Sequence, residues 1–161
     1  MSENFSGWLC RLVRQFSADF DCERTSIYVR DQDGRFVTLV AQGLAGMTID
    51  VKPGEGLAGK CLDSGEPLIS NEAAYDTRSL CRLRDHYTGF VTRSLLVVPV
   101  KNQRGKVVAL VQLVNKTTGP FDEEDIKRLQ AAVRQLADLG KRVRQPVRNV
   151  WREGSADATQ T

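Results

Sequence analysis

The glycine-rich segment 54–61, with the sequence GEGLAGKC, is the first place where residue types and spacing could support chemistry. It contains the pattern G-x-G-x-x-G and also the glycine and lysine spacing of a phosphate-binding loop. Cys61 stands where such a loop has the serine or threonine that binds magnesium, and the preceding strand pattern is weak. We therefore predict that these glycines permit a tight turn and a close approach of the short helix that follows.

Thiol chemistry at Cys81 is a second candidate. Arg78, Arg82 and Arg84 would lower the pKa of this thiol if they point toward it. The single histidine, His86, lies more than one helical turn away, and a free cysteine is commonly a small buried hydrophobe. The chain's cysteines and its lone histidine form no zinc-binding pattern. The sequence predicts no catalytic residue and no metal, with a redox sensor or thiol reductase using Cys81 as the alternative.

The segment 141–152 carries five basic residues, no acidic one, and Trp151 beside Arg152. Such a run could bind an anionic lipid, a nucleic acid or an acidic protein partner, although a solvated helix face is its commoner meaning. The whole chain has 23 Lys and Arg against 20 Asp and Glu, a net charge of +3. This balance is too mild to indicate a nucleic-acid-binding protein.

Length and composition indicate one globular domain. The chain has 161 residues, of which 41% are hydrophobic and 27% charged, and domains commonly have about 100–200 residues. Its apolar runs fall well short of the roughly 18 residues of a membrane helix, and the N-terminus lacks the apolar stretch of a signal peptide. We expect a cytoplasmic protein with reduced thiols and no membrane span.

Apolar periodicity places strands in the middle of the chain and helices at both ends. A three-and-four spacing predicts a helix from Phe5 to Phe20, and GLAGKCLD at 56–63 predicts a short one. The segment 76–92 is predicted as a helix or an ordered loop. The expected strands, with the last two central in the sheet, are 25–30, 36–41, 47–51, 67–70, 95–100 and 107–114. This order predicts an α+β domain: an antiparallel sheet with the terminal helices on one face and the middle segments on the other.

A long final helix is expected from Asp122, a plausible N-cap before an acidic first turn. Its apolar residues continue to Val150 at alternating spacings of three and four, interrupted by Gly140 and Pro146. This heptad pattern predicts a homodimer, although packing on the chain's own sheet explains its first half equally well. The predicted organisation is an N-terminal helix at 1–21, a sensor domain at 22–140, and a basic helix extension with a frayed tail at 141–161.

The segments 88–100 and 111–116, together with Phe121 and Asp125, resemble the GAF domains of cyclic-nucleotide phosphodiesterases and related bacterial adenylyl cyclases. The resemblance extends back through 54–59 and 64–68 to residues 24–26, and so covers about residues 22–140. It implies the helix and strand order predicted above. It also implies a small regulatory ligand, cAMP or cGMP, with no required cofactor.

A motif of the cyclic-nucleotide-binding members is similar to Asn115, Lys116, Phe121 and Asp125 here, with Ile126 in place of its final acid. Lys116 would end a strand and Asp125 would lie in the first turn of the next helix. An ion pair between them would fix the helix start to the sheet. Alternatively, Asp125 completes a capping arrangement with Asp122.

The resemblance also implies a set of ligand contacts. Hydroxyls and free amides at a helix N-terminus suit a cyclic phosphate, and a purine needs an apolar slot. The positions that match this pattern are Ser26, Leu57, Ala58, Asp85, Thr88 and Thr92. Guanine-specific recognition is not favoured, because the residues at the positions of an expected aromatic or acid are Ala41, Gln42, Cys81 and Gln112.

Two other GAF chemistries fit less well. Bilin-binding members attach their chromophore through Cys-His, whereas Arg82 follows Cys81. Free methionine sulfoxide reductases have a thiol where Ala58 stands. We therefore expect a stand-alone GAF sensor that passes its signal through dimer or partner contacts of the terminal helices. The alternative is an interaction module with a vestigial pocket, whose basic C-terminal helix binds a protein partner.

Overall fold

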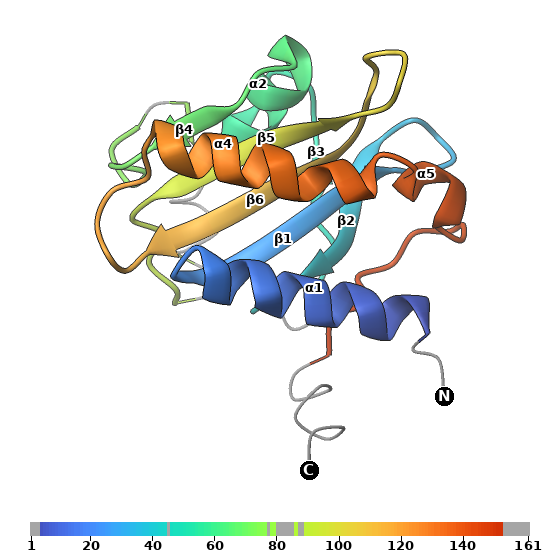
Figure 1. The fold of residues 1–161 in the computed structure, drawn as a ribbon, viewed down its shortest axis with the longest axis horizontal. Coiled ribbons are helices and arrows are strands. Elements are labelled where there is room, and N and C mark those ends of the chain that lie inside the picture. Colours follow the sequence, from blue (N-terminus) through green and yellow to red (C-terminus); the bar gives the residue numbers. More distant parts are fainter. Residues whose placement is uncertain (1–3, 45, 77, 80–85, 87–88, 153–161) are drawn as a thin grey trace.

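A six-stranded antiparallel sheet organises the computed structural model, which describes residues 4–44, 46–76, 78–79, 86 and 89–152 (Figure 1). From one edge to the other the strands are β3 (Asp50–Val51), β2 (Phe36–Ala41), β1 (Cys22–Arg30), β6 (Val107–Lys116), β5 (Leu95–Lys101) and β4 (Leu68–Ser70). The two hairpins and the placement of β6 at the centre confirm the strand predictions. Predicted strand 47–51 is shorter than expected, because the Ile49 N–H donates to the Thr38 hydroxyl instead of a backbone carbonyl.

Alternating side chains of the central strands build a separate core on each face of the sheet. Ile27 of β1 and Val111 of β6 pack in the larger core, beneath the terminal helices. Tyr28 and Leu110, one position along, pack in the smaller core with α2 (Gly56–Ser64). The sheet is thus buried on both faces, which is why β5 and β6 are almost continuously apolar.

The terminal helices cover one face of the sheet, as predicted. Helix α1 (Phe5–Asp19) begins at Asn4, whose side chain accepts a hydrogen bond from the Gly7 N–H. Helix α4 (Glu123–Ala132) begins at Asp122, and both helices lie across the same side of the strands (Figure 1). Their buried residues, Leu9, Val13 and Phe16 of α1 and Leu129 of α4, belong to the larger core. The fold class is therefore α+β, as expected.

The prediction of one long C-terminal helix is wrong. Helix α4 tightens into the 3-10 turn η1 (Val133–Leu136), and the last helix, α5 (Leu139–Arg142), is a single turn. Residues 143–152 then run without helix or strand back past α1; we call them the C-terminal strap (Figure 1). Gly140 and Pro146 disfavour a helix in this region. In the strap, the apolar side chains of Val143, Val147 and Val150 pack against the larger core.

The strap covers the part of β2 that β3 does not reach. The Val150 N–H donates to the Leu39 carbonyl at 2.8 Å, and the Ala41 N–H donates to Asn149 Oδ1 at 3.1 Å. Trp151 is buried, with the Arg14 guanidinium 4.6 Å from its ring centroid. The predicted basic helix extension is therefore an extended segment. The heptad stripe does not continue as a helix, because its last members pack on the chain's own core.

Candidate functional site

A cavity of about 110 Å³ lies on the α2 face of the sheet. Strands β1, β5 and β6 contribute Tyr28, Leu95 and Gln112, and the other walls come from the edge strand β3 and from the turn that begins α2. Lys52, Glu55, Leu57 and Ala58 are among the residues of those walls, and Ser79, from the segment between β4 and β5, also lines the cavity. The cavity therefore combines an apolar floor with polar groups on one side.

The glycine-rich segment shapes one wall of this cavity. Gly54 and Gly56 have φ values of +79° and +69°, which glycine adopts without strain. A Cβ on Gly59 would lie 2.1 Å from the Lys52 carbonyl oxygen, so only glycine permits this approach. Lys60 Nζ donates to the Gly54 carbonyl at 2.9 Å and so contacts the turn itself. The described strand pairs are all antiparallel, so the segment does not follow a strand of a parallel sheet. These glycines therefore build a turn, as predicted.

The start of α2 presents backbone donors to the cavity. Its N-cap residue, Glu55, makes no side-chain capping hydrogen bond. Leu57 and Ala58 occupy the first turn, where backbone N–H groups have no carbonyl partner within the helix. The partial positive charge of this helix end favours an anionic group. Gln112, 4% exposed on β6, adds an amide across the cavity.

The cavity brings together only some of the predicted contacts. Leu57 and Ala58 line it, as expected. Ser26 is buried on β1 opposite Gln112, and Thr92 is buried before β5, but neither lines the cavity. The predicted contacts Asp85 and Thr88, and the thiol of Cys81, lie outside the described residues.

Sequence reasoning missed Tyr28 and Lys52 as lining residues, and it considered Gln112 only as a departure from the family pattern. Strand alternation carried a signal for Tyr28, because it lies two residues from Ser26 and so shares its face. No comparable pattern marks Lys52, whose place depends on how the turn before α2 folds back.

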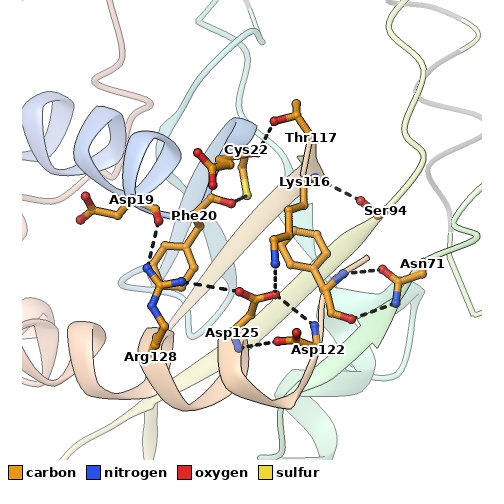
Figure 2. A network of polar contacts seen from close by, with 12 residues as sticks. Asp19, Phe20, Cys22, Asn71, Ser94, Lys116, Thr117, Asp122, Asp125 and Arg128 are labelled. Carbon is orange, nitrogen blue, oxygen red and sulfur yellow. Dashed lines mark hydrogen bonds and ion pairs between the residues drawn. The ribbon is translucent and has the colours of Figure 1, made fainter. Parts of the chain in front are cut away.

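The motif residues do not line this cavity. Lys116 and Asp125 lie at the junction of β6 and α4 (Figure 2). Lys116 Nζ lies 2.7 Å from Asp125 Oδ2, and the Asp125 carboxylate is almost completely buried. The same Oδ2 accepts the Asp122 N–H at 3.0 Å, while Asp122 Oδ1 accepts the Asp125 N–H at 3.0 Å. The ion pair and the capping box, given above as alternatives, therefore occur together.

Asn115 connects β6 to the segment that enters β5. Its φ is +58°, a left-handed conformation that asparagine tolerates better than most residues. Its Oδ1 accepts the N–H groups of Arg93 at 2.6 Å and Ser94 at 3.0 Å, and its Nδ2 donates to the Val91 carbonyl at 2.8 Å. The asparagine therefore fixes the backbone of residues 91–94 against the end of β6.

Phe121 has a two-point contact with the residue that follows β4. Its N–H donates to Asn71 Oδ1 at 2.8 Å, and Asn71 Nδ2 donates to its carbonyl at 3.0 Å. The Phe121 ring is buried in the larger core. The motif thus acts as a structural junction between β4, β6 and α4.

The buried thiols Cys22 and Cys61 are poor nucleophiles. Burial raises the pKa of Cys22 to about 12, with nearby Asp125 adding to the effect. Burial likewise raises the pKa of Cys61 to about 12. A thiolate is the reactive form, so neither residue is suited to thiol chemistry at neutral pH. Among the described residues, no group of three or more His, Cys, Asp or Glu is arranged to hold a metal ion.

No helix within the described ranges is long and apolar enough to cross a membrane.

Comparison with known proteins identifies relatives for most of the chain. A family model described as "GAF domain" matches residues 9–138. The dual 3',5'-cyclic-AMP and -GMP phosphodiesterase 11A of Takifugu rubripes is 31% identical over 124 residues, covering 68% of this chain and 14% of that protein. The dual 3',5'-cyclic-AMP and -GMP phosphodiesterase 11 of Drosophila melanogaster is 34% identical over 89 residues, covering 55% of this chain and 6% of that protein. The chain thus spans at most 14% of these two relatives.

Solved structures share the fold. The GAF domain of an Acinetobacter phosphoenolpyruvate-protein phosphotransferase matches with a TM-score of 0.70 and 24% identity, covering 88% of this chain and 84% of that chain. The type II free methionine-R-sulfoxide reductase of Thermoplasma acidophilum matches with a TM-score of 0.69 and 16% identity, covering 84% of this chain and 91% of that chain. At these identities the likeness concerns the fold alone.

Proposed function

This chain belongs to the GAF domain family, and on that premise we propose that it is a signalling module whose regulatory ligand is a cyclic nucleotide, cAMP or cGMP. The relatives named as dual cyclic-AMP and -GMP phosphodiesterases support this choice of ligand. Four residues of the family motif, Asn115, Lys116, Phe121 and Asp125, are present, with Ile126 in place of its final acid, and Lys116 and Asp125 form the ion pair at the start of α4. A signalling role follows from the family, and the nucleotide is our proposal.

The observation that carries the proposal is the cavity at the start of α2. A cyclic phosphate suits the backbone donors of Leu57 and Ala58, and the base would lie against the apolar floor that includes Tyr28 and Leu95. The cavity measures about 110 Å³, whereas small-molecule sites commonly have about 300–1,000 Å³. A nucleotide therefore requires the walls to separate, so that binding changes the structure around α2.

The central strands provide a route for this change. Tyr28 and Gln112 line the cavity, whereas their neighbours Ile27 and Val111 pack beneath α1 and α4. A shift of β1 or β6 would therefore reach both terminal helices. We infer that the output is a contact of these helices with a second copy of the chain or with a partner protein. Light scattering with and without ligand measures whether assembly changes.

Thermal unfolding with cAMP and with cGMP tests the proposed ligand. A ligand at about 100 times its dissociation constant adds about 2.7 kcal/mol to the free energy of unfolding and should raise Tm by a few degrees. Ala58→Glu places a negative charge in the first turn of α2, where it favours the helix but repels a phosphate. Ala58→Gln, nearly the same size and uncharged, is the matched control.

We expect a Tm increase that Ala58→Glu abolishes and Ala58→Gln retains at least in part. No increase with either nucleotide would contradict the ligand proposal. The family assignment would then favour the interaction module without a ligand, and a pull-down with the intact chain would be the next measurement.

We propose no catalytic activity for this chain. The raised pKa values of Cys22 and Cys61 support this for two of its thiols. An assay for reduction of free methionine sulfoxide, on the wild-type chain and on Cys81→Ser, tests it. Turnover by the wild type that the variant loses would instead establish the thiol reductase.

A further inference from the structure

A second concave site lies on the face of the sheet that carries the terminal helices. A groove of about 500 Å³ runs between the start of α1, the outer part of β2 and the C-terminal strap. Its apolar surface includes Phe5, Leu39 and Val150. Its volume falls within the range of about 300–1,000 Å³ that is common for small-molecule sites. The groove is distinct from the α2 cavity, with which it shares no lining residue.

Three arginines give this groove a strong positive charge. Arg142, Arg144 and Arg148 line it, all three are exposed, and no acidic residue belongs to its lining. In the described part of the chain, no carboxylate forms an ion pair with any of them. Within the described residues, three arginines therefore line an apolar surface without an acidic partner.

Arg142 is held in position by aromatic rings. Its guanidinium carbon lies 4.9 Å from the ring centroid of Phe5 and 4.5 Å from that of Trp8. An arginine that packs over aromatic rings can still donate from the N–H groups at the edge of its guanidinium plane. A side chain ordered in this way loses less conformational entropy when it binds an anion.

The strap that carries the other two arginines is also anchored. The hydrogen bond from Val150 to Leu39 fixes it to β2, and Asn149 contacts both β2 and the Met47 carbonyl. The buried ring of Trp151 anchors the strap one residue beyond Val150. The groove is therefore present before any ligand binds, and the positive end of α1 at Asn4 adds to its potential.

We propose that this groove binds a small amphipathic organic anion, a carboxylate or phosphate ester with an apolar body. The apolar surface would hold the body, and the arginines would bind the anionic group through charge-assisted hydrogen bonds. The concave shape and its volume favour one small molecule over a nucleic-acid backbone, which needs an extended basic surface and no apolar floor.

Titration of the intact chain with decanoate tests the proposal. The chain contains two tryptophans; Trp8 stacks on Arg142 and Trp151 follows Val150, so intrinsic fluorescence reports on this site. We expect saturable binding of one decanoate per chain, below the concentration at which decanoate forms micelles. Decanol, without the charge, and acetate, without the apolar body, should each bind at least about tenfold more weakly.

The double variant Arg144→Gln/Arg148→Gln removes two of the cations. It should weaken decanoate binding by about tenfold or more, since one charge-assisted hydrogen bond contributes about that factor. Arg104→Gln/Arg134→Gln is the matched control, because it removes the same net charge at exposed positions outside the groove and should leave the affinity unchanged. Circular dichroism shows whether both variants fold.

Three results would overturn the proposal: no saturable binding of decanoate, equal binding of decanol, or an unchanged affinity in the folded Arg144→Gln/Arg148→Gln variant. Binding to an acidic peptide or an anionic vesicle without saturable decanoate binding would also overturn it, in favour of a macromolecular partner. None of these outcomes depends on whether a cyclic nucleotide binds at α2.

Discussion

At the scale of single residues, Asp125 shows how one carboxylate serves two purposes. Its Oδ2 accepts hydrogen bonds from Lys116 Nζ and from the Asp122 N–H, and its Oδ1 lies 3.7 Å from Arg128 Nη1 (Figure 2). With the side chain only 3% exposed, these partners offset the cost of removing the charge from water. The sequence supported either the ion pair or the cap, and only the fold shows that both use the same oxygen.

Asp125→Asn should lower the free energy of unfolding by about 3 kcal/mol, because it leaves the largely buried Lys116 ammonium without its counter-charge. Urea denaturation measures the change. Glu124→Gln is the control, since it removes an exposed acid from the same helical turn and should cost about 0.5 kcal/mol. Equal losses in the two variants would show that the ion pair contributes little.

At the scale of elements, the turn before α2 and the C-terminal strap contrast in how far sequence patterns predict them. Glycines at 54, 56 and 59 indicated a tight turn, because few other residues permit these conformations and contacts. The strap carries a periodicity that is typical of a helix. Its apolar residues instead pack against α1 and β2 as an extended segment. The periodicity of the strap residues reflects only a local preference for helix. Their extended conformation depends on the apolar surface of the larger core, against which they pack.

Gly59→Ala should destabilise the domain and distort the start of α2, because its Cβ would lie 2.1 Å from a backbone oxygen that has little freedom to move. We expect a loss of at least about 1–3 kcal/mol in urea denaturation. Gly140→Ala is the opposite case, since nothing lies within 4 Å and α5 has helical backbone there. It should be neutral or stabilise by up to about 1 kcal/mol.

Trp151→Ala tests the strap. Because the ring is buried in the larger core, its removal should cost about 3 kcal/mol or more in the free energy of unfolding. Arg152→Ala, at the exposed neighbouring position, should change it by no more than about 0.5 kcal/mol. If residues 151 and 152 instead formed the frayed end of a helix, both variants should have small effects. A small effect of Trp151→Ala would therefore contradict the anchoring of the strap by this ring.

At the scale of the whole molecule, one sheet separates two packed cores and connects two candidate sites. The smaller core surrounds the α2 cavity, and the larger core supports the terminal helices and the arginine-lined groove. Homodimer formation stays a prediction. The part of the heptad stripe beyond α5 belongs to the strap, so a dimer would depend on the outer surfaces of α1 and α4.

The two cores also protect thiols. A shift in pKa from the ordinary value of 9.0 to about 12 lowers the thiolate fraction of Cys22 and Cys61 at pH 8 by about 1,000-fold. Labelling with a disulfide reagent, read by mass spectrometry, should therefore modify these two residues only after unfolding in urea. Fast labelling of either one in the native protein would contradict this prediction.

The same shifts predict a pH dependence of stability. The folded state retains both thiol protons between about pH 9 and 12, whereas the unfolded state releases them. The free energy of unfolding should therefore decrease as pH rises through this range. The double variant Cys22→Ala/Cys61→Ala should show a shallower decrease over the same range.

Apart from the length of β3, the sequence by itself determined the strands, the two hairpins, the start of α4 at Asp122 and the turn at Gly54–Gly59, because these depend on contacts and conformations close along the chain. Only the tertiary structure decided that Asn115 fixes residues 91–94, that Tyr28 and Lys52 meet at one cavity, and that residues 143–152 cover β2. Each of these depends on segments far apart in sequence, and the free energy of burying their shared surface exceeds the local preference of any one segment.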